Sequence, residues 1–247
     1  MNWLLVAALA AAGLVIGWCL RPLVFRLATS AGEAPGAAES RPAVAESPPG
    51  VAGSPPGAGP SRRARTGPPP LALELSTAIL LGGLAARVHP GLVLTAACWL
   101  AVCTVALAWI DIATLRLPDV LTAPAYAGTV VLLLAAAAAG GQWPVLLRAL
   151  LGGVALAGAY LSLALISRGA LGLGDVKLAA SLGTLTAWYG WPELVAGVLA
   201  GFLLGGIYGA ALLVRQRAAS QRRIAFGPFM VAGAFLAVLA AAAVTAS

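Results

Sequence analysis

Few residues in this chain could carry chemistry, because only eight of its 247 residues are acidic and one is a histidine. Five of the acidic residues lie either in a segment rich in proline and glycine or in the first turn of an expected helix, where an acidic side chain interacts favourably with the helix dipole. These five are Glu33, Glu39, Glu46, Glu74 and Glu193. The other three, Asp111, Asp119 and Asp175, are the candidates for catalysis.

Asp111 and Asp175 both lie where a long apolar run meets polar sequence. Asp111 ends the third apolar run, and Asp175 opens the sixth directly after Gly172-Leu173-Gly174. A carboxylate beside a membrane-spanning segment is costly, so such a residue is a functional candidate by default. The two glycines allow a sharp bend and a close approach of another segment. The alternatives are that Asp111 marks the water boundary and that Asp175 caps its helix.

Two aspartates at the same membrane level, on different helices, could do together what neither does alone. Two close carboxyl groups cannot both ionise readily, so they share a proton. One can then act as general base on a water molecule while the other donates a proton to a scissile carbonyl group. This is aspartic-protease chemistry, without a metal ion or a covalent intermediate. The sequence leaves open whether Asp111 and Asp175 approach each other.

Two more polar residues lie beside these candidates. Asp119 follows Pro118 and is expected to cap the next helix. Lys177 is the only lysine in the chain, and it either reaches toward lipid head groups or assists Asp175. No Cys-x-x-Cys pair occurs, so the sequence indicates no zinc site.

The composition is that of a membrane protein. Hydrophobic residues make up 61% of the chain, charged residues 9%, and the mean hydropathy is +0.95. Soluble domains carry about 25% charged residues. The composition therefore excludes a soluble globular enzyme, a nucleic-acid-binding module and a disordered chain, and it makes the lipid bilayer the expected surroundings.

Eight apolar runs separated by proline and glycine can be followed along the chain. A bilayer core requires about 20 apolar residues per helix, and backbone groups in lipid must be satisfied within the segment. The sequence therefore predicts an all-α integral membrane protein, a polytopic bundle of about eight transmembrane helices, in which the sixth run is the shortest. The glycines at 152, 153 and between 201 and 209 are expected to be helix-packing surfaces. The runs are Trp3–Leu20, Leu71–Val88, Leu92–Ile110, Val120–Ala139, Val145–Ile166, Val176–Trp188, Leu194–Val214 and Ile224–Ala246.

Three regions follow from this pattern. Residues 1–28 are expected to form an N-terminal transmembrane anchor helix, and residues 71–247 a multi-pass domain. Residues 29–70 between them are rich in proline, glycine and serine, and such a segment cannot bury enough apolar surface to offset its chain entropy. It is predicted to be a disordered cytoplasmic linker.

Basic residues predict how the helices are oriented. With the linker in the cytoplasm and eight alternating spans, 13 of the 15 basic residues lie on the cytoplasmic side. Only Arg87 and Arg148 lie on the far side. Such an excess of positive charge on one face is typical of the cytoplasmic side of membrane proteins. Asp111 and Asp175 are then expected at the cytoplasmic face.

The motifs around these aspartates resemble those of the type IV prepilin leader peptidases, membrane aspartic proteases of the Gly-x-Gly-Asp type. Ile110-Asp111 with Leu117-Pro118-Asp119 is similar to the family's first motif, and Gly172 to Leu178 is similar to its second. Phe226-Gly227-Pro228-Phe229 resembles the segment that opens the family's last helix. Gly17 to Leu27 resembles its first-helix pattern, with Arg21 where asparagine is usual.

The resemblance implies a function. It implies an aspartic endopeptidase of the bacterial inner membrane that removes the basic leader peptide from type IV prepilin or pseudopilin precursors, for a pilus or for type II secretion. Asp111 and Asp175 would be the catalytic residues, and Gly172, Gly174 and Lys177 would support the active-site loop. No metal ion, no other cofactor and no nucleic-acid partner is expected. The linker lacks the paired cysteines of many relatives, so N-methyltransferase activity is not favoured.

Two other functions use carboxylates in membranes. A proton- or ion-coupled transporter would also keep carboxylates at membrane depth, and it predicts acidic residues near the bilayer midplane together with internal repeats. Another Gly-x-Gly-Asp intramembrane protease would place its aspartates in different motifs. A catalytically silent scaffold would tolerate substitution of Asp111 and Asp175.

Overall fold

A computed structural model describes five stretches of the chain. They contain eight α-helices and no strand. The prediction of an all-α polytopic membrane protein is therefore confirmed. The described residues are 3–32, 71–115, 117–167, 172–215 and 225–245.

Five of the eight helices, α1, α3, α4, α5 and α7, are long and apolar enough to cross a membrane. The others are shorter, with 16 residues in α2, 17 in α6 and 19 in α8. The expected short sixth run is thus a short helix, although α2 is shorter still. The helices are α1 (Trp3–Gly32), α2 (Ala72–Arg87), α3 (Leu92–Thr114), α4 (Asp119–Gly140), α5 (Trp143–Ile166), α6 (Leu173–Tyr189), α7 (Trp191–Arg215) and α8 (Gly227–Thr245).

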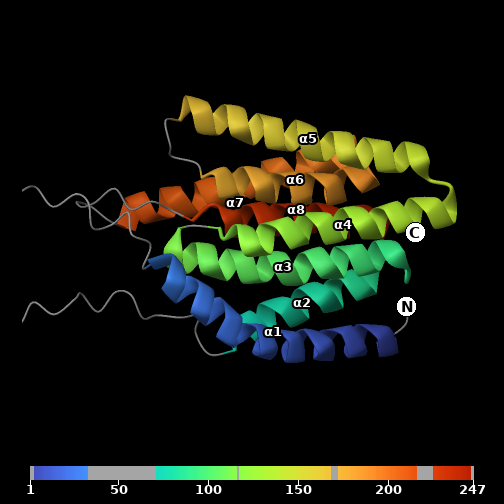
Figure 1. Cartoon of the computed structure of the whole chain (residues 1–247), viewed down its shortest axis with the longest axis horizontal. Coiled ribbons are helices and arrows are strands. Elements are labelled where there is room, and N and C mark those ends of the chain that lie inside the picture. Colours follow the sequence, from blue (N-terminus) through green and yellow to red (C-terminus); the bar gives the residue numbers. More distant parts are fainter. Residues whose placement is uncertain (1–2, 33–70, 116, 168–171, 216–224, 246–247) are drawn as a thin grey trace, which may run out of the picture.

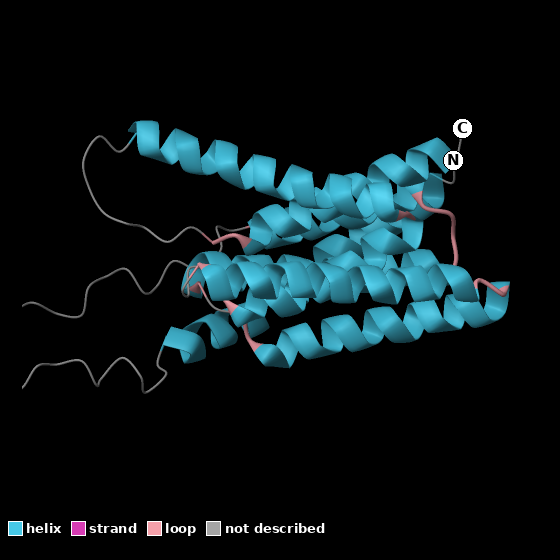
Figure 2. Cartoon of the chain, turned by 90° about the horizontal axis from the view of Figure 1, so that it is seen from above, coloured by secondary structure: helices cyan, strands magenta, loops and turns pink. Residues whose placement is uncertain are grey.

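The helices lie lengthwise beside one another, as both views show (Figure 1; Figure 2). The labels and sequence colours of Figure 1 show that successive helices alternate in direction. The last turn of α3 and the first turns of α4, α6 and α8 therefore share one end of the bundle, which we call the aspartate end. The opposite end holds the last turns of α2, α4, α6 and α8 and the start of α3. Helices α3 and α6 are central, since each packs on α4 and α8 as well as on the other.

Glycines allow the closest helix contacts. A side chain at Gly152 or Gly153 on α5 would collide with α6, and Gly201 on α7 lies against the start of α8, where an added Cβ would be 3.1 Å from the carbonyl oxygen of Phe229. Close packing of this kind holds helices together where lipid tails give no hydrophobic drive. The expected packing role is confirmed at these positions, whereas Gly206 faces open space.

Helix α1 is longer than predicted. It continues to Gly32, so the expected boundary at residue 28 falls inside the helix, because no strong helix breaker follows until Gly32 itself. Pro22 lies within α1, and Figure 1 shows the helix bending along its length, as an internal proline causes. The rest of the predicted linker, from residue 33 to residue 70, lies outside the described residues.

Candidate active site

Asp111 lies in the last turn of α3 and is only 5% exposed. Its Oδ2 accepts a hydrogen bond of 3.0 Å from the backbone N–H of Gly227, the first residue of α8. The carboxylate therefore lies at the N-terminus of α8, where the helix dipole favours negative charge. A water-boundary residue would be exposed, so that alternative does not hold for Asp111.

The contact between α8 and Asp111 requires a glycine. A Cβ added at Gly227 would lie 2.8 Å from Oδ2 of Asp111, closer than real Cβ atoms approach. Position 227 is separated from Asp111 by 116 residues, and it belongs to the Phe226-Gly227-Pro228-Phe229 segment that the sequence singled out. Gly227 is thus a positioning residue that sequence reasoning did not assign.

Asp175 lies in the first turn of α6 and is 8% exposed. Its Oδ2 accepts a hydrogen bond of 3.2 Å from the N–H of Gly172, and its own N–H donates to the carbonyl oxygen of Gly172 at 3.1 Å. Gly172, and not Asp175, is the N-cap residue. Asp175 closes the cap from the third helical position with one oxygen, while its buried Oδ1 has no hydrogen-bond partner within the described part of the chain.

The two glycines before Asp175 have different roles. Gly172 has φ −79° and ψ 150°, a conformation open to any residue, so the expected sharp bend is absent. Gly174 allows a close approach, because an added Cβ would lie 2.7 Å from the Cβ of Leu117. Leu117 belongs to the turn that follows Asp111. Gly174 therefore lets the first turn of α6 pack against the segment that leaves the first aspartate.

Asp111 and Asp175 lie at the same end of the bundle, in the last turn of α3 and the first turn of α6. Helices α3 and α6 pack on each other, and the two carboxyl groups are close enough to interact electrostatically. Each has one oxygen held by a backbone N–H at a helix N-terminus. Two buried carboxyl groups held in this way can share a proton and act as an acid and base pair.

Sequence reasoning missed an aromatic cluster beside this pair. Tyr160 of α5 is 4% exposed, and its ring centroid lies 5.9 Å from that of Phe202 and 6.3 Å from that of Phe226. Phe226 directly precedes the N–H that holds Asp111, and the Tyr160 phenol interacts electrostatically with Asp175. The signal was present, since Gly153 and Tyr160 are seven residues apart and share a buried helix face.

Lys177 and Asp119 form an exposed ion pair. The Nζ of Lys177 donates to Oδ1 of Asp119 at 2.6 Å, and the side chains are 52% and 70% exposed. The ammonium group of Lys177 is therefore paired with Asp119 of α4 instead of assisting Asp175. The expected cap by Asp119 is also wrong, because Pro118 is the N-cap residue of α4 and no side chain caps it.

Glu74 is more buried than its position in a first helical turn suggested. It is 3% exposed, and its Oε1 lies 3.5 Å from Nη1 of Arg21 on α1. An added Cβ at Gly17 would lie 2.6 Å from the Cα of Glu74, so α1 and α2 pack closely here. Sequence reasoning had given Glu74 only the helix dipole as a partner.

No three His, Cys, Asp or Glu side chains gather closely enough to hold a metal ion within the described ranges. An open cavity of about 580 Å³ lies at the end of the bundle opposite to the aspartates, with Arg87, His89 and Trp188 among its lining residues. That cavity is therefore separate from the aspartate pair.

Comparisons with known proteins agree on one family. The model of the type IV leader peptidase family matches residues 98–210, a region that includes both aspartates. The prepilin leader peptidase/N-methyltransferase of Dickeya chrysanthemi is 40% identical over 182 residues, which cover 69% of this chain and 59% of that protein. The protein of the same name from Aeromonas salmonicida (strain A449) is 33% identical over 171 residues, 68% of this chain and 56% of that protein.

A third relative is similar to a comparable extent. The prepilin leader peptidase/N-methyltransferase of Burkholderia pseudomallei (strain K96243) is 34% identical over 167 residues, 65% of this chain and 51% of that protein. The matched region therefore spans between half and three fifths of the length of these curated relatives. No solved structure matches the chain.

Proposed function

Because residues 98–210 make this chain a member of the type IV leader peptidase family, we propose that it is a prepilin peptidase. It would cut the basic leader peptide from type IV prepilin or pseudopilin precursors. The observation that carries the proposal is the buried pair of Asp111 and Asp175, whose carboxyl groups interact within the region that matches the family.

The proposed mechanism requires that the two carboxyl groups share one proton. The ionised carboxylate takes a proton from a water molecule, whose oxygen attacks the scissile carbonyl carbon, while the protonated carboxyl group gives its proton to the carbonyl oxygen. The tetrahedral intermediate then collapses and the carbon–nitrogen bond breaks. The leaving nitrogen receives a proton from the first carboxyl group, and the second carboxylate takes back a hydroxyl proton of the intermediate as the new carboxyl group forms. Either Asp111 or Asp175 can be the initial base in this scheme.

Backbone N–H groups orient the two carboxyl groups but take no part in the proton transfers. The N–H groups of Gly227 and Gly172 each hold one carboxylate oxygen at 3.0 and 3.2 Å, which leaves the other oxygen of each aspartate for water or substrate. Fixed orientation of reacting groups is a large part of catalysis. No metal ion or cofactor takes part in this proposal.

The precursor's apolar segment would lie against the helices within the lipid, with its basic leader in water at the aspartate end. This end is proposed to face the cytoplasm of a bacterial cell, across the inner membrane. Charge supports that orientation, because Arg21, Arg26 and Lys177 lie toward the aspartate end whereas Arg87 and Arg148 lie toward the other. The precursor would serve a pilus or a type II secretion system.

The proposal covers proteolysis and leaves out the methyl transfer named for the relatives. The segment from residue 29 to residue 70 contains no cysteine, so it lacks the paired motifs expected from the resemblance. A transporter is not favoured either, since every acidic residue in the described ranges lies within a turn of a helix end (Glu74, Asp111, Asp119, Asp175 and Glu193).

The test is cleavage by the purified chain. The full-length protein in phospholipid and detergent micelles is mixed with a purified precursor that has a basic leader, a glycine and an apolar helix, and the products are identified by mass spectrometry. We expect a single cut after the glycine. If the folded protein leaves several such precursors uncut at that site, the proposal is contradicted.

A further inference from the structure

Both helices that flank α6, α5 and α7, separate from the bundle toward the aspartate end. In α5 no residue from Leu161 to Ser167 is buried, and in α7 none from Phe202 to Val214 is buried. Figure 1 shows α5 and α6 diverging in the same direction. A helix that packs on its neighbours buries at least one face. The last turns of α5 and α7 therefore have no face that is buried against the bundle.

An aromatic cluster lies where these two helices separate. The rings of Tyr160, Phe202 and Phe226 have centroids between 5.1 and 6.3 Å apart. Below them, Tyr160 and Gly201 border a cavity of about 20 Å³ that α5, α6, α7 and α8 share, which has room for about one water molecule. Phe202 is 41% exposed and Tyr160 is 4% exposed. Phe202 is thus the ring that the cluster presents to the surroundings.

The cluster adjoins both aspartates. Tyr160 interacts electrostatically with Asp175, and Phe226 directly precedes Gly227, whose N–H donates to Asp111. Phe202 contacts both of these rings. A molecule that lies against Phe202 is therefore one side chain away from Asp175.

Two other sides of the aspartate pair are closed by packing. Toward α1 and α2, Ile110 is fully buried and packs in one apolar cluster with Leu73. Toward α4, Leu117 lies against Gly174. An apolar helix in lipid can therefore approach the pair from the side between α5 and α7, where the last turns bury no residue.

We propose that the apolar helix of the precursor docks between the last turns of α5 and α7, with its first turn against Phe202. This inference rests on the proposed function, which supplies the occupant: a peptide bond that joins a basic leader in water to an apolar helix in lipid. In lipid, helices associate through close packing of their surfaces. Large exposed apolar side chains on both helices offer such a surface, namely Leu165, Ile166, Ile207, Leu213 and Val214.

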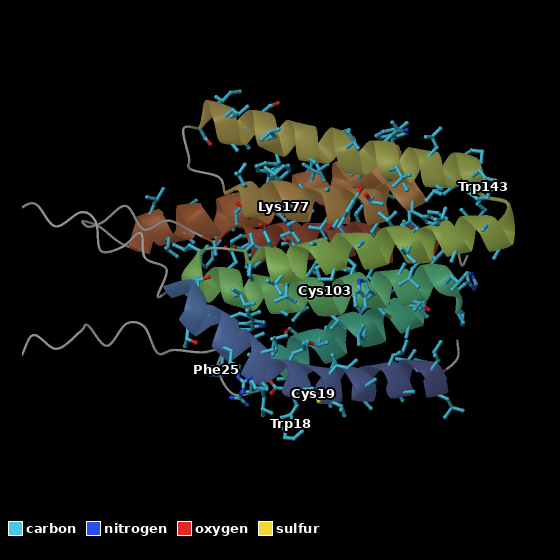
Figure 3. The ribbon with its side chains drawn as sticks, in the orientation of Figure 1. Trp18, Cys19, Phe25, Cys103, Trp143 and Lys177 are labelled. Carbon is cyan, nitrogen blue, oxygen red and sulfur yellow. The ribbon has the colours of Figure 1, made fainter. Side chains whose placement is uncertain are left out.

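The first test compares two substrates of the full-length protein in lipid nanodiscs. One substrate is the whole precursor, and the other is a short peptide with the same leader and cut site but without the apolar helix. The variants are Phe202→Ala and Phe202→Leu. Phe25→Ala is the matched control, because Phe25 is 39% exposed and lies on α1, across the bundle from α5 (Figure 3).

We expect Phe202→Ala to raise KM for the whole precursor about tenfold with kcat unchanged, since it removes a ring contact made equally in the ground state and the transition state. Phe202→Leu keeps apolar bulk and should raise KM about threefold, and Phe25→Ala should change it less than about twofold. The short peptide should be cleaved equally by all variants, because it has no helix to dock.

Three outcomes would overturn the docking site. They are equal values of KM in Phe202→Ala and the wild type, equal rises in Phe202→Ala and Phe25→Ala, and a lower kcat of Phe202→Ala on the short peptide, which would assign Phe202 to the structure of the aspartate pair. A wild type that cleaves neither substrate would instead contradict the proposed function, and this inference with it.

The second test locates the bound helix directly. The photoreactive residue p-benzoylphenylalanine replaces Phe202 in the Asp111→Asn protein, which should keep the precursor uncut, and the mixture is irradiated and analysed by mass spectrometry. We expect a covalent product of one protein chain and one precursor, with the attachment in the first turns of the precursor's apolar helix. The same residue at position 25 should give clearly less of this product. A product of two protein chains, or adducts with lipid alone, would overturn the assignment of this surface to the precursor.

Discussion

Two sets of charged residues at the aspartate end, the buried Asp111 and Asp175 and the exposed pair of Asp119 and Lys177, differ in burial and in partners. Asp111 and Asp175 are 5% and 8% exposed, and backbone N–H groups hold them at the N-termini of α8 and α6. The Asp119 side chain is 70% exposed, and its partner Lys177 has a side chain that is 52% exposed. Aspartate side chains thus occur at this end both buried, with backbone N–H partners, and exposed, with a side-chain partner.

This difference indicates which acids can do chemistry. An exposed ion pair is screened by water and contributes little free energy, about 0–1 kcal/mol. A buried carboxyl group depends on its few neighbours, so a second carboxyl group nearby changes its protonation strongly. Lys177 satisfies Asp119 at 2.6 Å, whereas Asp175 keeps a buried oxygen without a partner in the described ranges.

The strongest test of the comparison replaces the buried acids. Asp111→Asn and Asp175→Asn should each lower the rate of precursor cleavage by about 10²–10⁴-fold, the usual contribution of a general acid or base. The side-chain amide keeps the size of the carboxyl group but cannot exchange the proton. Initial rates are measured by gel densitometry, and circular dichroism checks the helix content. Unchanged cleavage in either variant would remove that residue from the pair.

A smaller effect is expected when an acid is kept but displaced. Gly227→Ala places a Cβ 2.8 Å from Oδ2 of Asp111, closer than real Cβ atoms approach, so the carboxyl group must shift. We expect cleavage to fall roughly 10- to 100-fold, because small misplacements of reacting groups are costly. Gly206→Ala is the matched control, as nothing lies within 4 Å of its added Cβ. Equal activity of the two variants would show that the Gly227 contact does not position Asp111.

Tyr160→Phe tests how the buried surroundings of Asp175 affect catalysis. The phenylalanine keeps the ring contacts with Phe202 and Phe226 but removes the hydroxyl group near Asp175. We expect a loss of roughly two- to tenfold in kcat with KM unchanged, and an altered pH dependence of cleavage, because hydrogen bonding and polarity near a carboxyl group change its protonation. If only Tyr160→Leu had an effect, the residue would serve packing alone.

The smallest effect is expected at the exposed pair. Asp119→Asn and Lys177→Gln should each change the cleavage rate less than about twofold and the free energy of unfolding by less than about 1 kcal/mol. Thermal unfolding and cleavage at low and high salt measure both. A loss comparable to that of Asp175→Asn would erase the distinction between the two settings and bring Asp119 or Lys177 into the catalytic machinery.

Much of the architecture could be predicted from the sequence. Long apolar runs punctuated by proline and glycine allow little except helices in lipid, so the eight helices and their alternation were predictable. Helix ends were less so. The end of α1 lies beyond the expected boundary at residue 28, because no strong helix breaker occurs between that residue and Gly32. Local patterns describe where a helix is favoured better than where it stops.

The sequence by itself determined the helices, the end of the bundle that holds the acids, and the identity of Asp111 and Asp175 as candidates, since each of these depends on local composition and motif. Only the tertiary structure decided the partners. Gly227 reaches Asp111 across 116 residues, Lys177 turns to Asp119, and Tyr160 packs beside Phe226. Partners of this kind depend on how helices pack against one another, and packing is a property of whole surfaces that no local pattern contains.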